Sequence, residues 1–523
     1  MTPTLKEDTI KAPLGSDGLQ PEKHEETLNR VESIQNGAQE PERNEATHRG
    51  FKPRHSQMIA IGGAIGTSLF LGTGQVLRVG GPAFLLVSYG ILSILVYGVV
   101  TGIAEVTTYL PVPEGTMSYH GNKYVSRSLG FAMGYLYWYS LGILVLYELV
   151  ASTLLIDFWD PPVNPAIWIT VILIIIVILN FLPVRFFGEV EFWSAGMKII
   201  LIIGPDHDRL GFRYWKDPGP VNFYLEEGHI GRFVALLQSF VLAPFAFVLA
   251  PEQLIVTAGE MQSPRQNLPR AARRYFWRLI ILFMPTVIGI GVVCPSNNPR
   301  LSATSTASSP FVIAIRNARI PALDSIVNAL ILLSACTAGN AFLYSASRNL
   351  YSLAIAGNAP AIFKRCNNYG LPYFAVAASA SFSPLAYLSL SSTSLTVFNW
   401  LINITNSAGF ISWICCGAIY LRYRKAIEFH KVESPYRSRS QPWGLWAVTI
   451  GAVILLGDFL TAYIGIPVFL AIYLGHQCHS SQGAWFKEPG EIDMTEGLDE
   501  VLAAERPTPT RGRVSRVLHA LIE

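Results

Sequence analysis

The feature that most constrains this chain is a series of long apolar blocks along almost its whole length. Most of the blocks reach the roughly 20 residues that a membrane-spanning helix needs. Of the 523 residues, 51% are hydrophobic and only 14% are charged, against about 25% charged in soluble domains. The chain is therefore predicted to be an all-α polytopic membrane protein. The blocks lie near residues 57–79, 82–103, 129–156, 166–182, 233–257, 277–294, 322–345, 373–391 and 396–421.

Polar segments flank this apolar region. Residues 1–55 contain no apolar stretch that resembles a signal peptide, and their composition is typical of a disordered tail. We expect them to form a cytoplasmic N-terminal tail, residues 56–476 to form the transmembrane domain, and residues 477–523 to form a second disordered cytoplasmic tail.

Basic residues indicate the orientation of the chain in the membrane. Lys and Arg gather in short cytoplasmic loops, and here they crowd residues 265–278 and 422–439. Four blocks separate these loops, so both are predicted to be cytoplasmic. The basic run Pro269–Arg274 is explained by this rule, and the expected surroundings are membrane lipid rather than nucleic acid.

Two crossings are written unusually short. Five blocks precede the 265–278 loop, so an even number of crossings requires one more. Phe192–Gly204, which would be the fifth crossing in chain order, is the candidate, at about 20 Å of helix. Near the end of the chain, Trp443–Gly475 is too long for one membrane span and too short for two spans joined by a turn. If two helices form there, Gly457-Asp458 is the expected turn between them. The prediction is twelve crossings, with the fifth and eleventh abnormal.

The glycine content of the first crossing predicts an interrupted helix. The stretch IGGAIGTSLFLGTG, Ile61–Gly74, carries five glycines around Thr67 and Ser68, and each glycine weakens a helix by up to about 1 kcal/mol relative to alanine. We call this stretch the first break. Close helix packing through small residues is the alternative explanation.

A second apolar segment is interrupted by proline. Residues 240–253 read FVLAPFAFVLAPEQ, with Pro244 and Pro251 inside the segment and Glu252 next to the second proline. Proline removes a helix hydrogen bond and clashes with the preceding turn. We call this stretch the second break. Paired interruptions of this kind indicate a transporter site between two repeats of inverted topology, where freed backbone groups bind the carboxylate and ammonium of a zwitterion.

Three ionisable residues stand in apolar segments, where charge is costly and is usually functional. Glu252 lies at a break and is the strongest candidate. Glu105 ends the second block, and a position at the cytoplasmic interface explains it as well as a functional role does. Lys198 lies in the short fifth segment, from which its long side chain could instead reach the membrane surface. We predict proton coupling by these three residues.

The sequence lacks the common motifs of enzymes. The sequence has no phosphate-binding loop for ATP, no zinc-protease helix motif and no nucleophile elbow, so no enzymatic activity and no cofactor are expected. The aromatic residues of the third block are explained more simply by an interfacial belt than by a pocket. They are Tyr135, Tyr137, Trp138, Tyr139 and Tyr147.

Ordered motifs from about Phe51 to His476 resemble fungal amino-acid permeases of the yeast amino-acid transporter family, within the amino acid–polyamine–organocation superfamily. They include RHSQMIAIGGAIGTSLFLGTG, AEVTTYLPVPEGTMSY, PRQNLPRA and SASRNLYSLA. The resemblance implies a LeuT-like fold of five plus five inverted-repeat helices with two extra helices. It also implies proton-driven import of an amino acid, of neutral or proline type, across the plasma membrane.

The resemblance also implies roles for particular residues and partners. Glu252 falls on the acid of the second break, Lys198 on a fifth-helix lysine linked to proton coupling, and Glu105 on the acid that follows the second helix. The implied partners are a packaging chaperone of the endoplasmic reticulum and ubiquitin-ligase adaptors, with Lys6, Lys11 and Lys23 as acceptors. The predicted substrate-binding residues are Ile65, Gly66, Thr67, Ser68, Phe245, Phe247 and Glu252.

The chain departs from the family pattern in three places. Ala250-Pro251 replaces a small, Gly-rich step before Glu252, the fifth helix stops early at Gly204-Pro205, and a piece is missing between Val453 and Asp458. The two gaps leave open that the chain is an inactive product of a deletion or a wrongly drawn gene. A second alternative, independent of the gaps, is an amino-acid sensor that does not transport.

Overall fold

The structure, a computed structural model, describes most of the apolar region. The described residues are 69, 72–111, 116–181, 212–247, 249, 251–252, 254–255, 263–302, 309–317, 323–367, 370–390, 394–459, 465–479, 485–496, 498 and 501. The chain divides into two compact units, Met1–Ala46 and Thr47–Glu523, and all described residues belong to the second. Lys198, the short fifth crossing and residues 65–68 lie outside the described part.

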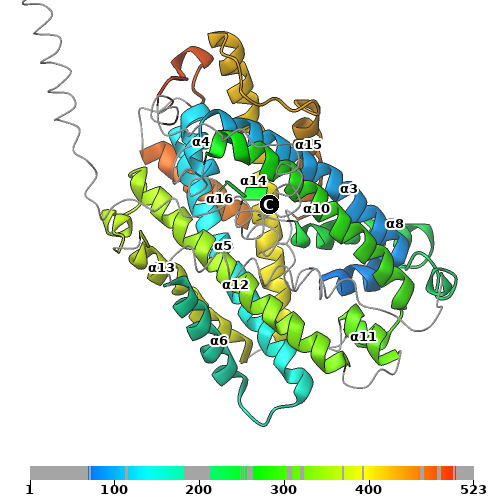
Figure 1. The fold of residues 1–523 in the computed structure, drawn as a ribbon. Coiled ribbons are helices and arrows are strands. Elements are labelled where there is room, and N and C mark those ends of the chain that lie inside the picture. Colours follow the sequence, from blue (N-terminus) through cyan, green and yellow to red (C-terminus); the bar gives the residue numbers. More distant parts are fainter. Residues whose placement is uncertain are drawn as a thin grey trace, which may run out of the picture. The chain divides into compact units, whose positions relative to one another are not determined.

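The described residues form helices and connecting turns, without a strand. Seven of these helices are long and apolar enough to cross a membrane, which supports the predicted fold class. The helices (Figure 1) are α3 Thr73–Tyr109, α4 Met117–Tyr124, α5 Arg127–Ile156, α6 Pro165–Asn180, α8 Gly228–Leu242, α10 Pro264–Val293, α11 Pro310–Asn317, α12 Leu323–Ile355, α13 Tyr373–Ala380, α14 Ser394–His430, α15 Trp443–Phe459 and α16 Gly465–His479.

Local sequence sets several helix ends. The hydroxyl of Ser126 accepts a hydrogen bond from the Leu129 N–H and caps α5, and Asn164 caps α6 just before Pro165. Ser and Asn are favoured caps and proline is favoured in the first helical turn. α3 bends sharply at Gly81, where φ is +77° and an added Cβ would lie 2.9 Å from a backbone oxygen. α3 is thus two helices joined at a glycine.

α5 lies at the centre of the described helices. Of the seven candidate spans it is the most buried, with 83% of its apolar window inside the protein, and it packs along α12, α4 and α14 (Figure 1). A helix that is apolar on all sides belongs in such a position. Most side chains of α5 therefore face neighbouring helices.

The two basic loops meet at one end of the bundle, as predicted. The predicted loop at 265–278 is the start of helix α10, and its Arg273 side chain hydrogen-bonds to Tyr436 in the second basic region. Arg424 at the end of α14 reaches Glu105 at the end of α3. Loops that touch lie on the same side of a membrane, so an even number of crossings separates them.

The predicted turn at Gly457-Asp458 is wrong. α15 continues through both residues to Phe459, and the next helix, α16, begins at Gly465. Two helices do form from this stretch, as expected. A glycine followed by an aspartate does not end a helix when the flanking residues are strongly apolar, because glycine costs only about 1 kcal/mol there.

Part of the C-terminal tail is packed, which corrects the expectation of disorder for residues 485–496. Ile492 and Met494 are 1% and 3% exposed. The Tyr109 hydroxyl donates to the Met494 carbonyl at 2.9 Å, and the Lys123 ammonium donates to the Glu496 carbonyl at 2.9 Å. Alternating apolar residues in EIDMTE bury one side of the segment against α3 and α4, a pattern that its polar composition hides.

Substitution of Gly98 is expected to loosen α3 from α15. A Cβ at Gly98 would lie 2.5 Å from the Gly444 carbonyl oxygen, whereas one at Gly90 on the same helix would meet only the Met284 methyl at 3.8 Å. Gly98→Ala should therefore lower the free energy of unfolding by about 1–3 kcal/mol, and Gly90→Ala should not. Unfolding temperatures of the two purified variants in detergent check this, and equal temperatures would contradict it.

Candidate functional site

The second break is present where the prolines predicted it. α8 ends at Leu242, and a single 3-10 turn, η4 Ala243–Ala246, follows with Pro244 in its first turn. Leu249 then adopts a left-handed backbone with φ +59°, a conformation that a leucine rarely takes. Glu252 stands in a short helical turn immediately after this interruption.

The described end of the first break lies beside the second. Its described residues before α3, Leu69 and Gly72, have π-helical geometry and lead into α3 at Thr73, and a Cβ at Gly72 would be 3.9 Å from the Phe245 ring. Gly72, at the end of the first break, therefore lies next to the second break, about 170 residues away in the sequence. The other predicted residues of the first break, Ile65, Gly66, Thr67 and Ser68, lie outside the described residues.

Phe245 and Phe247 both pack into aromatic clusters. The Phe245 ring meets Tyr147 edge to face, with centroids 4.6 Å apart. Phe247 is fully buried between Tyr89 and Phe283, at 5.5 and 5.1 Å. Such contacts anchor the break through large apolar areas. Neither phenylalanine lines the cavity that holds Glu252.

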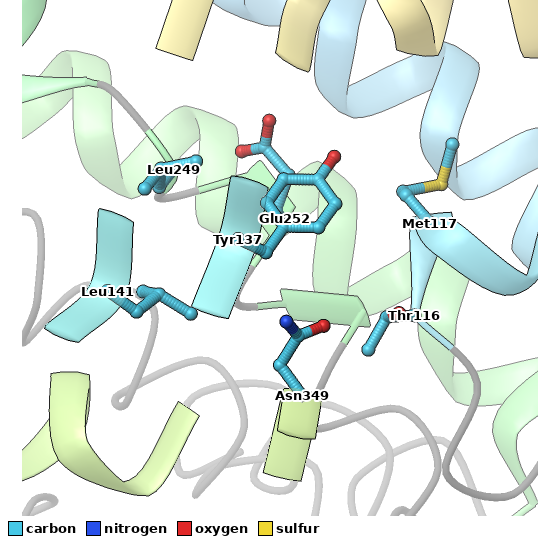
Figure 2. Close-up of a pocket in the computed structure, with 7 residues that line it drawn as sticks. All are labelled: Thr116, Met117, Tyr137, Leu141, Leu249, Glu252 and Asn349. Atoms are coloured by element: carbon cyan, nitrogen blue, oxygen red, sulfur yellow. The ribbon is translucent and has the colours of Figure 1, made fainter. Parts of the chain in front are cut away.

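Glu252 faces a small cavity. Its side chain is buried, with the residue 5% exposed, and the surrounding side chains come from the second break, α5, α12 and the start of α4 (Figure 2). Three of them are apolar, so the cavity offers a low-dielectric wall with a few polar groups, as ligand sites do. The lining residues are Thr116, Met117, Tyr137, Leu141, Leu249, Glu252 and Asn349.

A chain of hydroxyl groups holds Glu252. The Ser412 hydroxyl on α14 donates to Oε1 of Glu252 at 2.5 Å, and the Tyr137 hydroxyl lies 2.8 Å from the Ser412 oxygen. Because a serine has one hydroxyl proton and Ser412 gives it to Glu252, Tyr137 donates to Ser412. The dipoles of both hydroxyl groups thus point their positive ends toward the carboxylate, and such chains strengthen one another.

Glu105 lies elsewhere, at the end of α3. Its carboxylate makes a 3.0 Å ion pair with Arg424 and accepts hydrogen bonds from the Tyr420 hydroxyl and the Ser438 N–H, at 3.2 and 3.3 Å. The Glu105 side chain is fully buried and that of Arg424 is 11% exposed. Glu105 therefore joins α3 to α14 and to the loop before α15, and the structure does not bring it to the cavity of Glu252.

Sequence reasoning missed residues that line the cavity and one that holds Glu252 in place. Asn349 and Ser412 were not predicted, although an asparagine in the apolar helix α12 is a polar residue at membrane depth, a signal that could have found it. The belt explanation for the third-block aromatics is wrong for Tyr137 and Tyr147, which are 4% and 0% exposed. Spacing along α5 could not show which tyrosines face other helices.

These features define a class of protein: a multi-pass helical membrane protein in which a crossing segment is interrupted next to a buried acid. Two solved structures share the fold. One is a nucleobase-cation-symport-1 family transporter with bromovinylhydantoin bound. Its superposition covers 88% of this chain and 99% of the transporter, at 14% sequence identity and a TM-score of 0.50. A manganese transporter of Eremococcus coleocola covers 89% and 98% at 10% identity, with a TM-score of 0.53. The LeuT-like fold is confirmed; the count of twelve crossings stays a prediction.

The chain belongs to the amino acid permease family, whose sequence model matches residues 55–487. It is 41% identical over 515 residues to the proline-specific permease of Emericella nidulans, covering 90% of this chain and 94% of that protein. It is 37% identical to the proline-specific permease of Saccharomyces cerevisiae, covering 91% and 83%. The dicarboxylic amino acid permease of Saccharomyces cerevisiae is 36% identical, covering 83% and 78%. The chain is therefore a transport protein and not an enzyme.

Proposed function

We propose that this chain imports a neutral, proline-type amino acid across the fungal plasma membrane, driven by a proton gradient. The observation that carries the proposal is the buried Glu252, placed at the second break and facing a cavity. The substrate class is supported by the relatives named as proline-specific permeases. The energy source is the gradient, so no cofactor is needed.

Proton coupling needs a group that can take and release a proton beside the substrate path. Glu252 meets this requirement by position. The nearest histidine in sequence to the cavity lining, His120 on the short helix α4, does not: burial, followed by the neighbouring Lys123, lowers the pKa of His120 to about 3. Its ring is then neutral at any physiological pH. Proton coupling by Glu105 and Lys198 stays a prediction.

Alternating access around the two breaks is the proposed mechanism. The proximity of Gly72 to Phe245 in the second break supports it, because a motion of one helix group against the other would then open the site to each face in turn. Both chain ends are proposed to be cytoplasmic, where the N-terminal lysines Lys6, Lys11 and Lys23 would be open to ubiquitin ligases. A packaging chaperone is the further proposed partner.

Uptake of radiolabelled L-proline into a permease-deficient fungal strain tests the proposal. Cells that express this chain should accumulate proline at an acidic external pH, and a protonophore should lower the accumulation by at least about tenfold. Proline accumulation that is unchanged by the protonophore would overturn the proposed proton coupling. Proline binding to the purified chain without accumulation would favour the sensor, and neither binding nor uptake would favour the inactive product.

A further inference from the structure

A loop segment before α8 runs along the bend of α3 at Gly81. The Ala83 N–H donates to the Pro220 carbonyl at 2.9 Å, and the Asn222 N–H donates to the Gly80 carbonyl at 3.2 Å. Because Gly81 departs from helical geometry, backbone groups beside it need partners outside the helix. The loop supplies them on both sides of the bend. We call the stretch from Pro220 to Asn222 the clamp segment.

The Asn222 side chain uses both ends of its amide. Its Nδ2 donates to the Arg78 carbonyl of α3 at 2.8 Å, and its Oδ1 accepts the Ser296 hydroxyl at 3.0 Å. Ser296 is 3% exposed and follows α10, which ends at Val293. Turning the amide over would set Oδ1 against the Arg78 carbonyl oxygen, so the two bonds fix one orientation. Asn222 therefore ties the clamp segment to α3 and to the end of α10.

Glycines bring the clamp segment and α8 close to α3. A Cβ at Gly81 would lie 2.9 Å from the Pro220 carbonyl oxygen. A Cβ at Gly80 would overlap the Ser239 hydroxyl of α8 and lie 3.4 Å from the Ser239 Cβ. Small residues allow helix backbones to approach in this way, and α3 and α8 lie side by side (Figure 1).

The two helices that meet here belong to the two breaks. Residues 73–80 of α3 follow the first break, and α8 leads into the second. They run in opposite directions, because Gly72 lies next to Phe245 whereas Gly80 lies next to Ser239. The clamp segment therefore joins the helix that leaves one break to the helix that enters the other.

The clamp segment lies at the face of the membrane opposite to Glu105. Residues 82–109 of α3 follow the bend as about 42 Å of helix, more than the roughly 30 Å of a hydrocarbon core. Glu105, near the far end, pairs with Arg424 in the basic region that is predicted to be cytoplasmic. In that orientation the bend and the clamp segment are external.

We propose that the clamp segment, anchored by Asn222, holds residues 73–80 of α3 against α8, so that the two helices move as one unit. Asn222 is a positioning residue, because it acts on the breaks through α3 and does not line the cavity of Glu252. The clamp rests on the proposed function and deepens it, since a fixed pair of helices keeps the external sides of both breaks at one separation during transport.

Disulfide cross-linking tests the clamp without transport. In the double variant Gly80→Cys, Ser239→Cys the two Cβ atoms would lie 3.4 Å apart, close to the range of about 3.5–4.5 Å found in disulfides. Copper phenanthroline should link them in the purified chain, and mass spectrometry of the linked peptides distinguishes this bond from the six native cysteines. A double variant that does not cross-link would overturn the clamp.

Asn222→Ala in the double-cysteine chain should slow cross-linking by about fivefold, because two hydrogen bonds of the clamp are lost. Asn298→Ala is the matched control and should keep the parent rate, since Oδ1 of Asn298 accepts the Arg300 N–H within its own turn. Ser296→Ala removes one clamp bond and should also slow cross-linking, and it carries the test if Asn222→Ala does not fold. Equal rates in all these variants would overturn the role of Asn222.

Uptake of labelled L-proline tests whether the two helices move together. Complete cross-linking of Gly80→Cys, Ser239→Cys should change uptake by less than about twofold relative to the reduced chain, because a rigid unit needs no internal movement. Loss of uptake on oxidation that a reductant restores would overturn the unit. If the wild-type chain takes up no proline while cross-linking still depends on Asn222, the proposed function fails and the clamp stands.

Discussion

Glu252→Gln is expected to abolish proton-driven amino-acid uptake, to below about one hundredth of the wild-type rate. Glutamine keeps the length of the side chain and can still accept the Ser412 hydroxyl at its oxygen, so the second break should fold. It removes the negative charge and the proton-binding atom. A hydrogen bond to a charged group contributes about 1.5–3 kcal/mol, and 1.4 kcal/mol is about tenfold. Initial uptake rates, normalised to permease at the cell surface, measure the effect.

Two further measurements make this result specific. Glu252→Asp retains the charge and should keep part of the activity. Exchange of internal for external amino acid at equal pH on both sides needs no net proton movement. If Glu252 contacts the substrate amine as well as carrying the proton, the Gln variant should lose exchange too. Normal driven uptake by the Gln variant would show that Glu252 has neither role.

Arg424→Ala is expected to destabilise the fold by about 3–5 kcal/mol, because it leaves the Glu105 carboxylate buried without its partner. Glu105 would keep only the bonds from Tyr420 and the Ser438 N–H. The variant should be retained inside the cell and should unfold at a clearly lower temperature in detergent. Fluorescent fusions report the retention, and thermal unfolding of the purified variant reports the stability.

The neighbouring arginine supplies the control. Arg422 lies on the same helix and contacts the tail, with its guanidinium 4.8 Å from the Phe486 ring. Such a pair at a partly exposed site contributes about 0.5–1 kcal/mol, so Arg422→Ala should be mild. The double variant Glu105→Gln, Arg424→Met leaves no unpaired charge at this position, so it should be more stable than Arg424→Ala. If the double variant is as unstable as Arg424→Ala, the ion pair is not the cause.

Much of the architecture was predictable from patterns along the chain. Apolar blocks located the long helices, prolines 244 and 251 located the second break, and the basic loops predicted which helix ends lie together. These features are local: they depend on how many apolar residues follow one another and on where a backbone hydrogen bond is missing. Gly457-Asp458 failed as a turn because local breakers are weak within a strongly apolar run.

The composition of the site was not predictable in the same way. Glu252 was found because a carboxylate beside a proline is unusual at membrane depth, but its hydroxyl partner Ser412 is 160 residues away and the facing Asn349 almost 100. Small polar residues occur in most of these helices, and only packing decides which of them face a common cavity. The same packing separated Glu105 from Glu252, two acids that the sequence had grouped as proton-coupling candidates.

The amino-acid sequence alone predicted a membrane transporter with two broken helices and an acid at one of the breaks, because the cost of placing backbone and charge in lipid constrains every apolar block. The tertiary structure decided which oxygens in the cavity have partners. Packing of α5, α12 and α14 satisfies Oε1 of Glu252 and Nδ2 of Asn349 and leaves one acceptor on each. Hydrogen-bond satisfaction depends on distances between helices, and no one-dimensional pattern encodes those distances.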